Sequence, residues 1–82
     1  MIQYIQTLKI EGGIELKGTL RSLRRYRDIT QAEAAETLGI SPEALSNYER
    51  GKFYPTAPII DRMLKLYDVK FEDINFLYKD ND

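Results

Sequence analysis

The polar side chains between residues 42 and 50 recur at a spacing that places them on one face of a helix. The set consists of Pro42, Glu43, Ser46, Asn47 and Arg50. Because an α-helix turns once every 3.6 residues, positions i, i+1, i+4, i+5 and i+8 share one side. Amide, carboxyl, hydroxyl and guanidinium groups can pair with base edges in a DNA major groove. A solvated helix face has the same pattern, so the spacing alone leaves both interpretations open.

Two residue types that are common in enzyme active sites, cysteine and histidine, are missing from the sequence. The 82 residues include no cysteine and no histidine, which removes thiolate chemistry, the usual general base and the commonest metal ligand. We find no nucleophile–base pair and no phosphate-binding loop. We therefore expect that the protein is not an enzyme and that it uses no metal or other cofactor. We also expect that it senses no small-molecule ligand, because no attached effector domain is present.

A short helix is predicted just before the polar face. Thr30 is a suitable N-cap, and Glu33 completes a T-x-x-E capping box with it. Apolar residues then recur every three positions up to Leu38. The pattern predicts a helix over about residues 31–38.

A second helix must follow after a tight turn. Gly39 is placed to end the first helix, because glycine readily takes a positive φ. Ser41 is a suitable N-cap and Pro42 fits the first helical position, so a helix over about 42–50 is predicted. Since only residues 39–41 separate the two helices, they must cross steeply. This layout is that of a helix-turn-helix.

A wider set of residues resembles the Cro/CI-type helix-turn-helix family of phage and bacterial repressors. The resemblance covers about residues 16–78 and is specific because several spaced motifs agree. The motifs are Leu20-Arg21-Ser22-Leu23-Arg24, Gln31-x-x-x-Ala35-x-x-x-Gly39-Ile40-Ser41-x-x-x-Leu45-Ser46-x-Tyr48-Glu49-x-Gly51, Gly51-x-x-x-Pro55 and Tyr67-Asp68-Val69-x-Phe71-x-Asp73-Ile74. The resemblance implies an all-α, five-helix domain of the lambda-repressor type that binds double-stranded DNA.

The resemblance also implies roles for individual residues. Gln31 matches a position that contacts phosphate and steadies the recognition helix. The positions that read bases in this family are occupied by Pro42, Glu43, Ser46 and Asn47. Ser41, together with the first N–H groups of its helix, could hold a second phosphate while it also acts as a plain N-cap.

The chemistry of these side chains suggests particular contacts. Asn47 could bond adenine in a bidentate fashion, Glu43 could accept from a cytosine amino group, and Pro42 could touch a thymine methyl. Glu43 fits a structural role equally well, because a negative charge near a helix N-terminus interacts favourably with the helix dipole. Arg50 and Lys52 leave the helix toward the DNA backbone, where we expect phosphate contacts.

An ion pair between Arg24 and Glu49 is implied by the same resemblance. Arg24 lies beside the apolar side of the first helix and Glu49 follows the apolar Tyr48, so we expect a partly buried pair. Two exposed charges, worth only ~0–1 kcal/mol, are the alternative.

The charge distribution is compatible with a nucleic-acid partner. The net charge is −1 and the sequence pI is about 5.4, whereas nucleic-acid-binding domains are often basic. However, residues 17–52 carry seven basic and five acidic residues, a net of +2, and residues 53–82 carry four and six, a net of −2. We expect modest, salt-sensitive binding. We see no signal peptide and no membrane-spanning run, which favours the cytoplasm.

The remaining segments are predicted from apolar periodicity. A first helix is expected over about 16–27, a fourth helix capped by Thr56, and a short fifth helix over 71–78. Residues 16–78 would form the DNA-binding domain, and residues 79–82 would be a frayed tail.

The N-terminal extension, residues 1–15, has two interpretations. Alternating apolar residues around the turn at 11–13 favour a short β-hairpin. A helix would instead place Ile2, Ile5 and Leu8 on one side, although Thr, Ile and Tyr are weak helix formers.

These patterns favour a transcriptional regulator, most simply a repressor that occludes a two-fold operator as a homodimer. The apolar Phe76-Leu77-Tyr78 end is the expected dimer surface, with the Tyr4–Ile10 strand as the alternative. A different class of function is a protein-interaction module, such as an antirepressor or assembly factor, that keeps the fold without DNA binding. The acidic pI supports that alternative.

Overall fold

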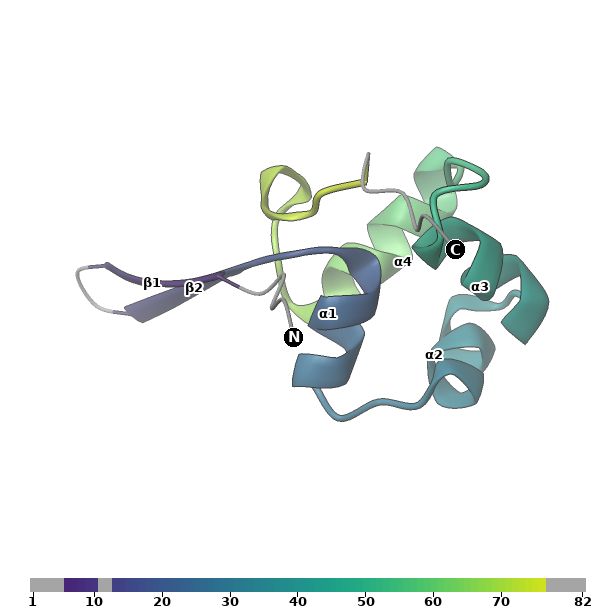
Figure 1. Cartoon of the computed structure of the whole chain (residues 1–82), viewed down its shortest axis with the longest axis horizontal. Coiled ribbons are helices and arrows are strands. Elements are labelled where there is room, and N and C mark those ends of the chain that lie inside the picture. Colours follow the sequence, from purple (N-terminus) through teal and green to yellow (C-terminus); the bar gives the residue numbers. More distant parts are fainter. Residues whose placement is uncertain (1–5, 11–12, 77–82) are drawn as a thin grey trace.

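The computed structural model describes residues 6–10 and 13–76 of the chain. Within these ranges the elements are β1 (Gln6–Ile10), β2 (Gly13–Lys17), α1 (Leu20–Tyr26), α2 (Gln31–Leu38), α3 (Pro42–Glu49), α4 (Ala57–Tyr67) and the 3₁₀ helix η1 (Phe71–Asp73). The helices form one body, and the strand pair projects from the side of that body opposite α3 (Figure 1). None of the helices in these ranges is long and apolar enough to cross a membrane.

The core lies where the four α-helices meet. Its buried apolar residues are Leu20, Leu23, Ala34, Ala35, Leu38, Leu45, Met63, Tyr67 and Ile74. Every α-helix contributes at least one of the fully buried side chains. Burial of a leucine or methionine side chain contributes roughly 1.5–3 kcal/mol. Since helices of seven to eleven residues are marginal alone in water, this shared core is what keeps them folded.

The helix-turn-helix is formed by α2 and α3 with the predicted boundaries and caps. Thr30 Oγ1 accepts a hydrogen bond from the Glu33 N–H at 3.1 Å, and Glu33 Oε1 accepts one from the Thr30 N–H at 2.9 Å. The backbone hydrogen bond from Thr30, aided by the Thr30 hydroxyl, lowers the pKa of Glu33. Gly39 ends α2 in the left-handed region, with φ of 76°, as its position in the sequence predicts.

The first helix begins later than the sequence suggested. Leu16 and Lys17 belong to β2, so the prediction of a helix from about residue 16 was wrong. The reason is a backbone bridge at Gly18, whose N–H donates to the Asp73 carbonyl at 2.9 Å and whose carbonyl accepts from the Asn75 N–H at 2.8 Å. This pairing keeps the chain extended up to Thr19, which then caps α1.

The predicted fifth α-helix over residues 71–78 was wrong in its described part. The segment forms only the 3₁₀ helix η1 before Ile74 joins an isolated parallel bridge with Gly18. The Asn75 N–H donates to Gly18 and is therefore not available to continue a helix. Leu77, Tyr78 and the tail at 79–82 lie outside the described residues.

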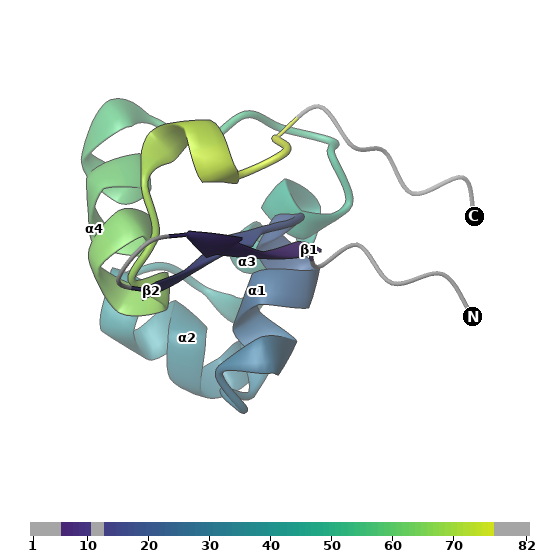
Figure 2. The same ribbon diagram turned by 90° about the vertical axis from the view of Figure 1, so that its left-hand side faces the viewer.

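The N-terminal strands pair antiparallel, from Gln6 opposite Lys17 to Ile10 opposite Gly13. The pair runs directly into the bridge between Gly18 and Ile74, which joins the base of the hairpin to the segment after η1. Figure 2 shows β1 and β2 in front of the helical body, beneath η1 and its following segment. Ile2, Tyr4 and Ile5, on which the sequence interpretations also drew, lie outside the described residues.

Arginine side chains cap the ends of two helices from elsewhere in the fold. Arg27 Nε donates to the carbonyl of Tyr67, the last residue of α4, at 3.0 Å. Arg62 Nη1 donates to the carbonyl of Leu38, the last residue of α2, at 3.0 Å. A positive charge near a helix C-terminus also interacts favourably with the helix dipole and so stabilises the helix. Thr56, by contrast, occupies the N-cap position of α4 without the predicted side-chain capping bond.

Gly39→Ala is expected to lower the free energy of unfolding by about 1–2 kcal/mol, because the left-handed conformation crowds a Cβ atom. The added Cβ would also lie 3.3 Å from Arg62 Nη1, which caps α2. Urea unfolding followed by circular dichroism measures the loss. Gly39→Asn is the control: asparagine tolerates this conformation better and should retain more stability. Equal stability of the alanine variant and the wild type would contradict the prediction.

Candidate nucleic-acid interface

The start of α3 and the turn before it are open to solvent. Ser41, Pro42 and Glu43 are exposed, and Ser46 and Asn47 one turn later are half-buried. Ser41 Oγ caps α3 by accepting a hydrogen bond from the Ala44 N–H at 3.0 Å. The predicted base-reading residues therefore occupy one accessible side of a short, capped helix.

The two predicted backbone contacts at the far end of α3 are also exposed. Arg50 is the C-cap residue of α3, and Lys52 follows in the next turn, where its N–H donates to the Asn47 carbonyl at 2.9 Å. Both side chains belong to exposed residues. They extend the polar side of α3 with two positive charges.

The opposite side of α3 is held by only two fully buried residues, Leu45 and Glu49. Leu45 belongs to the apolar core. Tyr48 is half-buried and packs against the edge of the core. The small apolar contribution of α3 makes the polar contacts of Glu49 important for its position.

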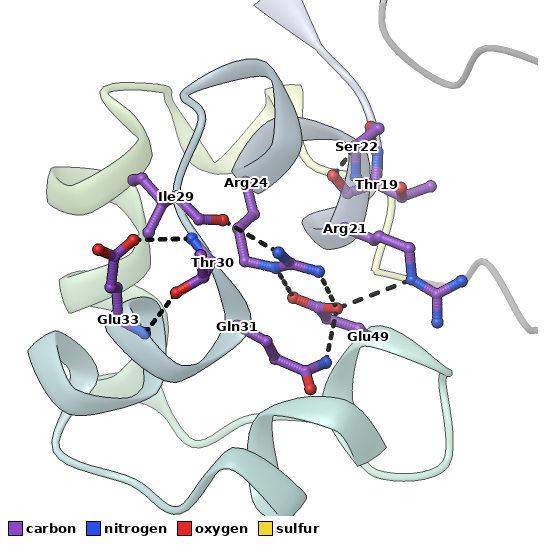
Figure 3. Close-up of polar contacts among 9 residues, drawn as sticks. All are labelled: Thr19, Arg21, Ser22, Arg24, Ile29, Thr30, Gln31, Glu33 and Glu49. Atoms are coloured by element: carbon purple, nitrogen blue, oxygen red, sulfur yellow. Dashed lines mark hydrogen bonds and ion pairs between the residues drawn. The ribbon is translucent and has the colours of Figure 1, made fainter.

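Glu49 and Arg24 form the ion pair that the sequence led us to expect. Arg24 Nε lies 2.6 Å from Glu49 Oε2, and Arg24 Nη2 donates to Oε1 at 3.1 Å (Figure 3). The Glu49 side chain is fully buried, and only 9% of the Arg24 side chain is exposed. Arg24 Nη1 also donates to the Ile29 carbonyl at 3.0 Å, so the guanidinium group joins α1, α3 and the loop before α2.

Two further side chains reach the same carboxylate. Gln31 Nε2 donates to Glu49 Oε1 at 3.2 Å, and Arg21 Nε lies 3.7 Å from that oxygen (Figure 3). Gln31, predicted as a phosphate contact, is thus also tied to the end of α3. The structure brings it together with Arg24 and Glu49.

The sequence analysis did not single out Arg21 as part of this site. Its spacing offered a signal, since residues i and i+3 lie on neighbouring positions of a helix surface and Arg21 precedes Arg24 by three. The spacing alone could not show that Arg21 meets Glu49, because Glu49 comes from a distant segment of the sequence.

The core residue Tyr67 lies within the electrostatic reach of this cluster. Burial, and secondarily the negative charge of Glu49, raises the pKa of its hydroxyl above the ordinary value. Tyr67 therefore stays neutral at physiological pH and adds no charge to the network.

The comparisons with known proteins agree with this architecture. The helix-turn-helix family matches residues 20–74, a segment that includes α1 to η1 and both partners of the buried ion pair. The chain belongs to this family. Its motifs identify it as Cro/CI-type, and the strand pair lies outside the matched segment. No solved structure matches the chain.

Several relatives in this family carry functional names. An uncharacterised HTH-type transcriptional regulator of Methanocaldococcus jannaschii is 33% identical over 67 residues, covering 82% of this chain and all of the relative. Antitoxin PezA of Streptococcus pneumoniae is 38% identical over 55 residues, which are 67% of this chain and 35% of the antitoxin. The HTH-type transcriptional activator BcrR of Enterococcus faecalis is 31% identical over 61 residues, which are 74% of this chain and 30% of the activator.

Glu49→Gln is expected to lower the free energy of unfolding by about 3–5 kcal/mol, because it leaves the charge of Arg24 buried without its partner. Arg24→Met should also be destabilising, because it removes both Arg24 hydrogen bonds from a buried carboxylate. Thermal or urea unfolding measures both. Glu36→Gln, which removes an exposed carboxylate from α2, is the control and should change stability by less than about 0.5 kcal/mol. Unchanged midpoints for both Glu49→Gln and Arg24→Met would refute the structural role of the pair.

Proposed function

We propose that this protein is a transcriptional regulator that binds duplex DNA sequence-specifically, with α3 in the major groove. The observation that carries the proposal is the division of α3 into two sides. Its exposed side presents small polar groups, and its inner side is fixed by Leu45 and the Glu49 ion pair. A helix held rigidly on one side and open on the other suits base recognition.

The roles proposed for the exposed residues follow from their chemistry. Asn47 and Glu43 are suited to adenine and to the cytosine amino group, Pro42 to a thymine methyl, and Ser46 to either a donor or an acceptor on a base edge. Base contacts of this kind specify the sequence, whereas backbone contacts fix the register of the protein on DNA.

Backbone contacts are proposed for four residues around α3. These are Gln31, Ser41, Arg50 and Lys52. Gln31 is the first residue of α2 and Ser41 is the N-cap of α3, so both are placed near helix N-termini, which attract phosphate. Arg50 and Lys52 add charge at the other end of α3. Two curated relatives are named as a transcriptional regulator and as the transcriptional activator BcrR. These names support a role in regulation without fixing its direction.

We propose repression by occlusion of a two-fold operator. One recognition helix reads few base pairs, whereas a two-fold dimer doubles the contact and spaces two half-sites about one DNA turn, ~34 Å, apart. An aromatic cluster supports a dimer surface at the C-terminal end of the described chain. The Phe76 ring centroid lies 5.3 Å from that of Tyr54 and 5.4 Å from that of Phe71. Tyr54 and Phe71 are about half exposed, and exposed aromatic clusters often mark protein interfaces.

Asn47→Ala is expected to weaken binding to the preferred duplex by about 1–3 kcal/mol while barely changing binding to random DNA, because it removes a base contact. Lys52→Ala should weaken both alike and flatten the salt dependence, because it removes a phosphate contact. Fluorescence anisotropy with both duplexes at several salt concentrations separates the two effects. Equal losses for both variants on both duplexes would contradict the assignment.

Phe71→Glu is expected to convert a dimer into a monomer at micromolar concentration, because a buried, unpaired carboxylate is costly in an apolar interface. Sedimentation velocity measures the change. Tyr26→Glu is the matched control: Tyr26 is 51% exposed and Phe71 49%, but Tyr26 lies on α1, outside the aromatic cluster. A wild-type monomer, with and without operator, would end the dimer proposal. Loss of the dimer on removal of residues 1–13 alone would transfer the role to the N-terminal strands.

The alternative function is a protein-interaction module on the same fold. The exposed aromatic cluster and the pI of about 5.4 favour it. Selection of bound duplexes from a random pool at low salt discriminates the two functions. Enrichment of a common sequence supports DNA binding, whereas no duplex binding together with salt-resistant binding of a protein partner supports the alternative.

A further inference from the structure

We propose that Phe53 is an apolar contact to DNA and that its ring meets the sugars of the minor groove at the centre of a two-fold operator. The inference rests on the proposed function and deepens it, because that function assigns only polar and charged side chains to the DNA backbone. Phe53 adds a contact whose contribution to affinity does not depend on salt.

Phe53 is the most open of the exposed aromatic residues that the structure describes. It is 62% exposed, whereas Tyr54 is 56% exposed. The Tyr54 ring centroid lies 5.3 Å from that of Phe76. Within residues 6–10 and 13–76 the Phe53 ring has no such aromatic partner and does not pack against the core. Single exposed apolar residues are common on protein surfaces, so the position of Phe53 in the fold decides its role.

Backbone hydrogen bonds hold Phe53 close to the end of α3. Gly51 takes the left-handed conformation, with φ of 77°, and its N–H donates to the Tyr48 carbonyl at 3.1 Å. The Lys52 N–H donates to the carbonyl of Asn47, a proposed base-reading residue, at 2.9 Å. These two bonds close the C-terminus of α3 and fix the start of the following loop. Phe53 is the next residue of that loop.

Phe53 lies in the chain between the two surfaces that the proposed function uses. Lys52 before it is the proposed phosphate contact. Tyr54 after it belongs to the aromatic cluster that is the proposed dimer surface. Pro55 is buried, so the loop is anchored to the fold within two residues of Phe53. The exposed ring is therefore continuous with the proposed DNA interface and stands next to the proposed two-fold contact.

A two-fold complex offers this ring an apolar surface on the DNA. When two recognition helices occupy major grooves one DNA turn apart, the minor groove between them faces the protein on the two-fold axis. The groove is about 6 Å wide in B-DNA, and deoxyribose rings form its walls. An apolar contact with these sugars displaces water rather than counterions, so it adds affinity without adding to the salt dependence. Because the width of the minor groove varies with base sequence, the contact also makes binding sensitive to the central base pairs.

The experiment measures affinity for an enriched duplex against salt concentration for the wild type, Phe53→Ala, Phe53→Leu and Lys52→Ala. Phe53→Ala is expected to weaken binding about tenfold and to keep the wild-type slope of log affinity against log salt. Phe53→Leu keeps an apolar side chain and should lose less affinity. Lys52→Ala should flatten the slope by about 0.9, the contribution of one phosphate contact. Tyr26→Ala is the matched control: it removes a ring that is 51% exposed on α1 and should leave the affinity unchanged.

A second duplex tests where on the DNA the ring lies. Its central base pairs are exchanged between A·T and G·C, while both half-sites stay the same. The exchange is expected to change the affinity of the wild type several-fold and that of Phe53→Ala by less, because the alanine variant lacks the contact with the groove. An equal change in the two proteins would overturn the proposal.

The other outcomes separate this inference from the proposed function. A wild-type protein that binds no duplex at low salt would overturn both. Wild-type binding that Lys52→Ala weakens, with the same affinity for Phe53→Ala as for the wild type, would overturn the role of Phe53 alone. A flatter salt slope for Phe53→Ala would mean that the ring only supports Lys52, and loss of the dimer by this variant in sedimentation velocity would make Phe53 part of the dimer surface. Either result would also overturn the proposal.

Discussion

The position of α3 depends on a buried carboxylate more than on apolar contact. Leu45 and Glu49 are the only residues of α3 that are buried. Burial of Leu45 contributes roughly 1.5–3 kcal/mol, and half-buried Tyr48 adds a smaller apolar contact at the edge of the core. Glu49 can be buried because Arg24 meets both of its oxygens and Gln31 donates to one of them. Desolvation makes the net stability of such a pair small, but its directional bonds fix where the end of α3 lies relative to α1 and α2.

Other arginines also fix the positions of helix ends through directional hydrogen bonds. Arg27 joins the end of α1 to the end of α4, and Arg62 joins α4 to the end of α2. Each guanidinium satisfies a helix carbonyl that would otherwise lack an intrahelical partner. A small core with one to three buried apolar residues from each α-helix is thus supplemented by polar contacts between helix ends. These contacts specify orientation, which apolar burial alone does not.

The sequence predicted the elements that local chemistry determines. The T-x-x-E box at Thr30, the left-handed Gly39 and the Ser41-Pro42 start defined α2 and α3 because caps act within a few residues. It misplaced the start of α1 and the structure after Asp73, because both depend on the bridge between Gly18 and Ile74, whose partners are far apart in sequence. Within the candidate site, the family motif led to Arg24 and Glu49. Arg21 was not found, because nothing near it in the chain indicates that it meets Glu49.

The internal contacts also explain how an acidic chain could present a surface for DNA. Glu49 is surrounded by guanidinium and amide donors, and Glu33 is bonded to the Thr30 backbone. The negative charge of Glu49 is thus compensated by arginine within the fold. Arg24 and Arg27 are likewise engaged within the fold, so the net charge of residues 17–52 is a poor measure of what DNA would meet. The relevant charges are those at the edges of α3 and around Gln31, because only charges that approach phosphates closely displace counterions from DNA. A few such contacts would give modest nonspecific affinity and leave discrimination to the polar side of α3.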